Sequence, residues 1–211
     1  NGNTSILPNT SALFADEKTY TVTLTVTDAG KTSSQSKTVT VYKKPVVDFG
    51  VSVTKGCLPL TVTFTSNGTA GDGTIADYTW DYGDGVVTNS ATNTSDHTFI
   101  VAGMQSPSLT VTNSYGCQSV FLKDSMVHVL PALNASFHPK DSFLCAINDS
   151  AFFINNSTGP GNLSYTWNFG DGGTSTGKQP FHVYNTPGAY TVALMVNSSE
   201  GCIASSLVNT T

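Results

Sequence analysis

Three aspartates in two similar short blocks of the sequence carry the groups best suited to acid–base or metal chemistry. Asp81 and Asp84 lie in the first block, and Asp171 lies in the second. An acid/base pair or a calcium site built on these blocks would need both carboxylates in each copy. Asn168 replaces Asp81 in the second block, so we expect these side chains to stabilise tight turns instead. Calcium binding by Asp-rich loops such as residues 72–77 is the alternative.

Other residue patterns typical of catalysis are missing from the sequence. His97 and His182 recur at one position beside an aromatic residue, and neither has a second His or Cys at metal-ligand spacing. The only two glutamates, Glu17 and Glu200, exclude a glycosidase that uses paired Glu residues. Neither Gly-x-Ser-x-Gly nor His-Glu-x-x-His occurs. The sequence therefore predicts a protein that is not an enzyme, with structural histidines and no metal or cofactor beyond the calcium alternative.

The composition also limits the classes of partner. Charged residues make up 11% of the chain, the net charge is −5, and all nine basic residues are Lys. Recognition of nucleic acids depends strongly on Arg, so no nucleic-acid partner is expected. No apolar run approaches the length of a membrane span, and residues 1–4 lack the features of a signal peptide. We therefore expect a mature segment, or an internal piece of a longer chain.

The aspartates belong to an eight-residue motif that occurs twice. Residues 78–85 read YTWDYGDG and residues 165–172 read YTWNFGDG. The aromatics alternate, which predicts a β-strand with one buried aromatic face, and Gly-Asp-Gly predicts a tight turn directly after it. The core motif residues are Trp80, Asp81, Gly83, Asp84 and Gly85, with Trp167, Asn168, Gly170, Asp171 and Gly172 in the second copy.

These motifs lie within a longer repeat of about 87 residues, in which matching cysteines, histidines and glycines recur in the same order. Each repeat has about seven short strands and no helical periodicity, which predicts antiparallel β-sandwiches in a linear array. We place complete repeats at residues 45–131 and 132–211. Residues 1–44 match only the second half of a repeat, so the first repeat is expected to be incomplete. Within it, residues 20–26 alternate cleanly and predict a strand with one buried face.

The motif W-[DN]-[YF]-G-D-G, followed by His-x-[FY] and then Gly, resembles the PKD (polycystic kidney disease) domain family. The resemblance covers nearly the whole chain and implies immunoglobulin-like sandwiches that serve as extracellular spacers or interaction modules. Gln105 and Pro107 stand where the last repeat has Tyr190 and Val192, so that strand is expected to be irregular. The Gly-Cys-Leu-Pro and Tyr-Gly-Cys segments resemble tandem PKD repeats of very large bacterial surface adhesins, including those of gliding bacteria.

Four cysteines in an extracellular chain are expected to be oxidised. One alternative pairs them within repeats, Cys57 with Cys117 and Cys145 with Cys202. In the sandwich that the resemblance implies, Cys57 and Cys117 lie at opposite ends, roughly 25 Å apart, whereas bonded cysteines need Cα atoms within about 7 Å. The preferred alternative bonds Cys57 to Cys202 across the boundary between repeats. Cys117 and Cys145 would then bond neighbouring repeats outside this sequence, and free thiols are the third alternative.

Asn-x-Ser/Thr sequons are unusually frequent, since they include eleven of the sixteen asparagines. This favours a glycosylated extracellular surface, although Asn and Thr also concentrate in turns and strands without glycans. The candidates are Asn3, Asn9, Asn67, Asn93, Asn134, Asn148, Asn155, Asn156, Asn162, Asn197 and Asn209.

Together, these observations predict a structural segment of a long cell-surface or secreted filament that carries an adhesive tip. Its partners would be neighbouring PKD repeats of the same chain, with disulfides making each joint a covalent clamp. The alternative is an extracellular accessory module that binds carbohydrate or protein, and exposed aromatics on one sheet would favour it.

Overall fold

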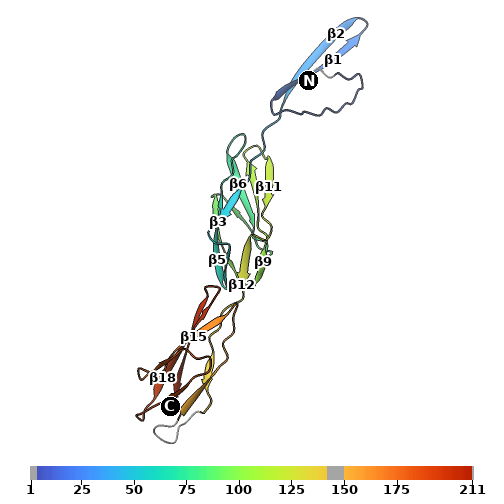
Figure 1. The fold of residues 1–211 in the computed structure, drawn as a ribbon. Coiled ribbons are helices and arrows are strands. Elements are labelled where there is room, and N and C mark those ends of the chain that lie inside the picture. Colours follow the sequence, from blue (N-terminus) through green and yellow to red (C-terminus); the bar gives the residue numbers. More distant parts are fainter. Residues whose placement is uncertain (1–3, 142–149, 211) are drawn as a thin grey trace.

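The computed structural model describes residues 4–141 and 150–210, and the described chain consists of strands, turns and loops without a helix. Three bodies follow one another along an extended chain: an N-terminal hairpin, a middle unit and a C-terminal unit (Figure 1). The all-β class and the tandem sandwiches predicted from the sequence are thus confirmed. Because the described residues form no helix, none of them forms a helical membrane span.

The N-terminal hairpin pairs β1 (Thr19–Asp28) with β2 (Lys31–Thr40) in one continuous antiparallel ladder. The predicted buried face of this segment is wrong. Val22, Leu24 and Val26 are 49%, 66% and 57% exposed, and only Tyr20 at the strand's start is buried. The alternating pattern forms the strand, but no second sheet among the described residues covers it.

The middle unit is built from three sheets around one aromatic core. The first sheet contains β3 (Phe49–Val51), β5 (Leu60–Ser66) and β8 (Thr94–Phe99). The second contains, in order, β11 (Gln118–Leu122), β10 (Ser108–Asn113), β6 (Ile75–Asp81) and β7 (Val87–Ser90). The third contains β4 (Lys55–Cys57), β12 (Val127–Leu130) and β9 (Gly103–Gln105). Alternation in β6 places Tyr78 and Trp80 in the core, where Trp80 is fully buried. Phe49 and Phe64 pack on the Trp80 indole with ring centroids 5.6 and 5.8 Å away.

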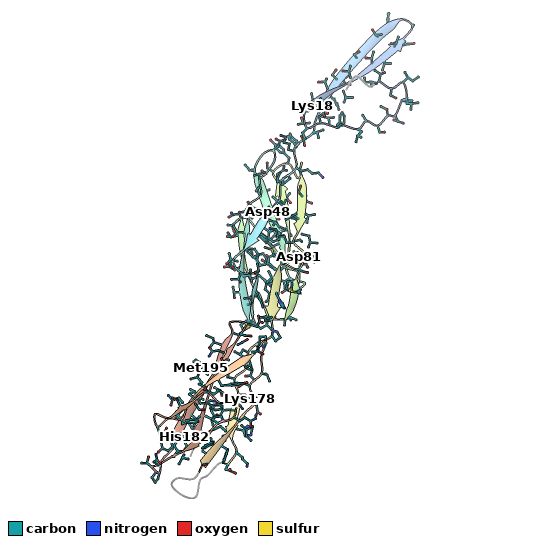
Figure 2. The ribbon with its side chains drawn as sticks, in the orientation of Figure 1. Lys18, Asp48, Asp81, Lys178, His182 and Met195 are labelled. Carbon is teal, nitrogen blue, oxygen red and sulfur yellow. A yellow bond between two sulfur atoms is a disulfide. The ribbon has the colours of Figure 1, made fainter. Side chains whose placement is uncertain are left out.

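The C-terminal unit repeats this plan with two sheets. The first sheet contains β13 (Phe137–Pro139), β14 (Ser150–Asn155) and β17 (Phe181–Val183). The second contains, in order, β16 (Thr174–Ser175), β15 (Leu163–Asn168), β18 (Tyr190–Ser198) and β19 (Ile203–Thr210). Trp167 is fully buried between Phe137 and Phe153. The two units have separate hydrophobic cores. Figure 2 labels Asp81 in the middle unit and His182 in the C-terminal one.

One strand differs between the units as the sequence predicted. In the C-terminal unit β18 is continuous over nine residues, whereas in the middle unit the same stretch is divided into β9 and β10. The break falls at Ser106 and Pro107, and proline lacks the N–H that a continuous ladder needs.

Candidate functional site: the joint between the two units

A disulfide joins the middle and C-terminal units where their ends meet. It links Cys57 in β4 to Cys202 in the turn between β18 and β19, across 145 positions of sequence, with Cα atoms 6.1 Å apart. Cys202 is 8% exposed. This is the pairing between repeats that the sequence analysis preferred. The within-repeat alternative is wrong for Cys57, because that cysteine is not bonded to Cys117.

A tight hairpin turn holds Cys202 at the end of the C-terminal unit. The amide N–H of Ser198 donates to the carbonyl of Cys202 at 2.9 Å, and that of Gly201 donates to the carbonyl of Ser198 at 3.0 Å. Gly201 has φ of +86°, a conformation that glycine adopts without strain. The Ser198 hydroxyl accepts from the N–H of Glu200 and donates to the carbonyl of Pro160. These bonds fix the direction of the Cys202 side chain.

Cys57 is fastened to the strand through which the chain leaves the middle unit. β4 pairs in parallel with β12, and Cys57 lies opposite Leu130. The amide N–H of Leu58 donates to the carbonyl of Leu130 at 3.0 Å. The disulfide therefore starts beside the peptide linker that follows Leu130. Both connections to the C-terminal unit leave the same end of the middle unit.

An ion pair accompanies the disulfide across the joint. The Lys55 ammonium contacts the Glu200 carboxylate, and both side chains remain partly exposed. An exposed pair of this kind contributes at most about 1 kcal/mol. The disulfide stabilises the joint more strongly: for 145 intervening positions, the loss of chain entropy in the unfolded state is worth about 5 kcal/mol. The disulfide therefore contributes more to the stability of the joint than the ion pair does.

The opposite end of the middle unit presents an equivalent turn with an unbonded cysteine. Cys117 follows Gly116, which has φ of +79°, and its carbonyl accepts from the N–H of Asn113 at 3.0 Å. Cys117 is half-buried and forms no disulfide with the described residues. Tyr115 occupies the position of Glu200 and stacks on Tyr42 with ring centroids 3.7 Å apart. Cys145, the fourth cysteine, lies outside the described residues.

Asn113 fastens the segment that enters the middle unit, a role that the sequence analysis missed. Its side chain is 1% exposed, and its Oδ1 accepts from the N–H groups of Tyr115 and Cys117. Its Nδ2 lies 3.1 Å from each of three carbonyl oxygens, those of Lys43, Ala70 and Asp72. An Asn that ends an alternating strand just before Tyr-Gly-Cys was the available signal.

The predicted core-motif aspartates bond to the protein itself. Oδ1 of Asp81 and Oδ1 of Asn168 each accept a backbone N–H at 2.9 Å, from Gly83 and Gly170 respectively. Asp84 and Asp171 accept the N–H that closes the following turn, at 3.1 and 2.9 Å. These bonds are those expected of turn-stabilising side chains.

Each repeat also joins its second aspartate to its histidine. The Nε2 atoms of His97 and His182 lie 2.7 Å from Oδ2 of Asp84 and Asp171. The hydrogen bond from His182 is the main cause that lowers the pKa of Asp171 below its ordinary value. Each imidazole also stacks on an aromatic of the motif, Tyr82 at 4.0 Å or Phe169 at 4.2 Å.

The loop suggested as a calcium site uses its carboxylates within the protein. Oδ2 of Asp72 accepts the N–H of Lys43 at 2.8 Å, and Oδ2 of Asp77 accepts the hydroxyl of Thr79 at 3.0 Å. Across residues 4–141 and 150–210, no three His, Cys, Asp or Glu side chains are gathered as metal ligands. Calcium binding therefore has no assembled ligand set in the described part of the chain.

Comparison with known protein families agrees with this repeated geometry. The family model of the PKD domain matches residues 42–129 and, separately, residues 136–211. The chain belongs to the PKD domain family. The two matched segments contain the two Trp-centred cores and the two Asp–His pairs described above.

Relatives of these PKD repeats include segments of bacterial collagenases. Collagenase ColA of Bacillus cereus is 59% identical over 39 residues, which is 18% of this chain and 4% of that protein. A microbial collagenase of Vibrio alginolyticus is 47% identical over 55 residues, which is 25% of this chain and 7% of that protein. The chain thus matches only a small part of each relative.

Solved structures of PKD domains are also similar to the chain. The PKD1 domain of Vibrio anguillarum Epp is 25% identical and covers 42% of this chain and 98% of its own, with a TM-score of 0.36. The PKD1 domain of the Vibrio cholerae metalloprotease PrtV is 32% identical and covers 37% of this chain and 93% of its own, with a TM-score of 0.33.

The glycosylation candidates differ in accessibility on the PKD repeats. Seven lie on the exposed surface: Asn9, Asn67, Asn93, Asn134, Asn156, Asn162 and Asn209. Asn197 is partly exposed, and Asn3 and Asn148 lie outside the described residues. Asn155 is 8% exposed, and its Nδ2 donates to the carbonyl of Lys178 at 3.0 Å. In the folded protein the Asn155 amide is thus buried and bonded, whereas the exposed candidates are accessible, and glycosylation of the candidates stays a prediction.

Proposed function

We propose that this chain is a spacer segment of a long cell-surface or secreted filament built from PKD repeats. The observation that carries the proposal is the Cys57–Cys202 disulfide. It joins two sandwiches that lie end to end in Figure 1. A module that only bound a ligand would not need a covalent bond at the joint. A spacer does, because its length depends on the angle between neighbouring units.

The same joint chemistry extends the proposal to the neighbours. Cys117 occupies in the middle repeat the turn position that Cys202 occupies in the last one, and it has no partner among the described residues. Cys117 would bond the Cys57 equivalent of a preceding repeat, and Cys145 would bond the Cys202 equivalent of a following one. A filament with a disulfide at every joint requires an oxidising compartment, which supports an extracellular location.

The proposal is tested by comparing the oxidised joint with an open one. The parent protein carries Cys117→Ser and Cys145→Ser, so that only the Cys57–Cys202 bond can form. Small-angle X-ray scattering should give one narrow distribution of interatomic distances for this parent. Adding Cys57→Ser and Cys202→Ser should broaden that distribution while leaving the unfolding of each repeat cooperative. Equal distributions for the two proteins would count against a stiff spacer.

A second candidate is an accessory module of a secreted protein that binds a polymeric substrate. The similarity to segments of bacterial collagenases favours it. Co-sedimentation with insoluble collagen fibrils and with insoluble polysaccharides tests this candidate directly. Saturable binding by the chain, absent from a heat-denatured control, would favour the accessory module over the spacer.

A further inference from the structure

The two repeats differ at one edge of the sheet that contains the tryptophan. In the middle repeat, β6 lies between β10 and β7, and β7 reaches as far as the pair Tyr78–Ser90. In the C-terminal repeat, β16 is only two residues long and pairs with Trp167 and Asn168. Within the described part of the chain, residues 163–166 of β15 therefore have no strand neighbour on the side opposite β18.

The hydrogen-bonding pattern of β15 shows which of its backbone N–H and C=O groups point to this open edge. The N–H of Phe169 donates to the carbonyl of Gly173 on the β16 side. Because backbone groups alternate along a strand, the N–H and C=O groups of Tyr165 and Leu163 point to that same side. The equivalent groups of Tyr78 pair with Ser90 in the middle repeat. In the described part of the C-terminal repeat, strand pairing on this side of β15 is limited to Trp167 and Asn168.

The segment that would continue β16 leaves the sheet to make other bonds. The carbonyl of Gly177 accepts the indole N–H of Trp167 at 2.9 Å, and the carbonyl of Lys178 accepts Nδ2 of Asn155 at 3.0 Å. In the middle repeat, where β7 stays in the sheet, the buried indole nitrogen of Trp80 has no hydrogen-bond partner among the described residues. In each repeat, the segment after the turn thus hydrogen-bonds either to the tryptophan indole or to the backbone at the edge of the strand.

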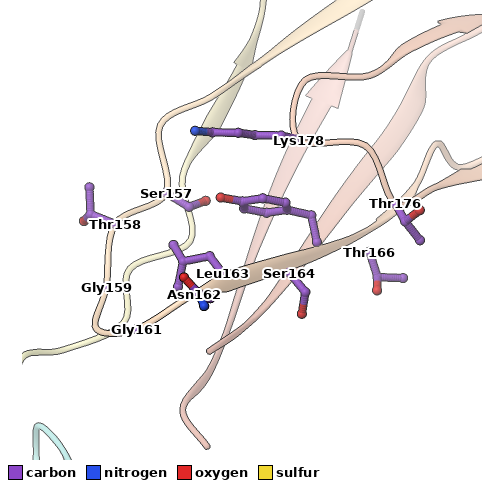
Figure 3. A pocket seen from close by; sticks show the side chains of 11 residues that line it. Ser157, Thr158, Gly159, Gly161, Asn162, Leu163, Ser164, Thr166, Thr176 and Lys178 are labelled. Carbon is purple, nitrogen blue, oxygen red and sulfur yellow. The ribbon is translucent and has the colours of Figure 1, made fainter. Parts of the chain in front are cut away.

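A groove of about 940 Å³ lies along the open edge of β15. Figure 3 shows it between Ser157 and Thr158 of the preceding loop, Ser164 and Thr166 of β15, and Lys178. Apart from Lys178, its lining side chains are uncharged. The groove therefore combines unpaired backbone groups with a polar, nearly neutral wall.

We propose that this groove binds an extended polypeptide strand that runs antiparallel to β15. The middle repeat itself shows the kind of occupant, because β7, with the uncharged sequence Val-Thr-Asn-Ser, pairs with Tyr78 and Thr79, the equivalents of Tyr165 and Thr166. The partner is accordingly an uncharged extended segment rich in Thr, Ser and Asn, bound through its backbone by strand addition. This interaction is separate from the spacer role, since it requires only the C-terminal repeat's edge.

The probe for this proposal is a synthetic peptide with the sequence of residues 86–94, VVTNSATNT. The protein is the full chain without glycans, because Asn162 also lines the groove. Nuclear magnetic resonance should show peptide-dependent shifts centred on the amides of Leu163 and Tyr165, with slower hydrogen exchange at both. A control peptide with proline at the positions of Ser90 and Thr92 should produce neither effect. Shifts elsewhere, or unchanged exchange at both amides, would overturn the proposal.

Two substitutions at one position separate backbone pairing from side-chain binding. Tyr165→Pro removes a groove-facing N–H and leaves the bonds to β18 in place, so peptide affinity should fall about tenfold or more. Tyr165→Ala keeps that N–H and should retain most of the affinity. If Tyr165→Ala abolishes binding, or if chitohexaose shifts these amides and the peptide does not, the site recognises a saccharide and the strand proposal is wrong. The exchange measurement on the unmodified chain decides the question even if the proline variant fails to fold.

Discussion

His182 and Asp171 form a hydrogen bond of 2.7 Å between Nε2 and Oδ2, and it ties the turn after the tryptophan strand to β17. The same bond occurs between His97 and Asp84 in the middle repeat. In both repeats the imidazole also lies flat on an aromatic ring of the motif. The pair thus connects a turn in one sheet to a strand in the other.

The first prediction concerns acid. The pKa of Asp171 is lowered from 3.8 in the folded state, chiefly by the hydrogen bond from His182. Between the folded and ordinary pKa values, the folded state binds fewer protons than the unfolded state, so stability falls as the pH falls. The Asp171 contribution should be present above about pH 4 and lost progressively below it. Asp171→Asn should weaken the pH dependence of the C-terminal repeat in calorimetric scans between pH 6 and 2.

Asp81→Asn is the matched control for that experiment, because Asn168 holds the equivalent position in the other repeat. It should leave the acid dependence of the C-terminal repeat unchanged. Identical pH profiles for Asp171→Asn and the unmodified chain would contradict the assigned role of the Asp171 carboxylate.

The second prediction concerns what the first aspartate of the motif contributes. Oδ1 of Asp81 accepts the N–H of Gly83, and Oδ1 of Asn168 makes the same bond to Gly170. Asp81→Asn should therefore change the free energy of unfolding by less than about 0.5 kcal/mol. Asp81→Ala removes the acceptor and should cost about 1 kcal/mol. Chemical denaturation measures both, and a large loss in the Asn variant would show that the charge itself matters.

The third prediction compares two glycines of one turn. Gly83 and Gly85 both have positive φ, +85° and +92°. A Cβ at Gly83 would lie 2.7 Å from the backbone nitrogen of Ser106, whereas one at Gly85 would meet open space. Gly85→Ala should cost only the conformational strain, about 1–2 kcal/mol. Gly83→Ala should cost clearly more, and equal losses in thermal unfolding would refute the clash.

The fourth prediction concerns alkaline conditions. Burial raises the pKa of Tyr184 to about 12, and its hydroxyl donates to the carbonyl of Phe169 at 3.0 Å. Above pH 10 the unfolded state loses this proton first, so the folded state binds more protons and stability falls as the pH rises towards 12. Tyr184→Phe should reduce this alkaline loss and cost about 1 kcal/mol at neutral pH. Denaturation at pH 8 and pH 11 tests both effects, and an unchanged alkaline slope would contradict them.

Residue periodicity was sufficient to predict the strands and cores of both repeats. The alternation around Trp80 and Trp167 led to two fully buried indoles, and Pro107 marked the broken strand. The disulfide at the joint was predicted because Cys57 and Cys202 lie in turns at opposite ends of neighbouring sandwiches. The strands and cores needed only local pattern, whereas the joint also needed the sandwich topology that the resemblance to PKD domains implies.

The features that were missed depend on contacts between segments distant in the sequence. The alternation at Val22 and Leu24 predicted a buried face, and the exposure of these side chains agrees instead with the incomplete first repeat expected from the repeat comparison. The open edge of β15 depends on whether the chain after Ser175 caps Trp167 or continues the strand. The bond from the Trp167 indole to Gly177 joins residues ten positions apart, and the alternation of residue types does not predict it.

The carbonyl of Leu130 accepts from Leu58, next to Cys57, so the disulfide and the peptide linker leave the middle unit side by side. One flexible connection alone would let a unit swivel about the long axis of the array. Two connections at separate points resist that torsion. Repeats joined in this manner would keep a constant rotation relative to one another, so the groove beside β15 would face a fixed direction relative to the middle repeat.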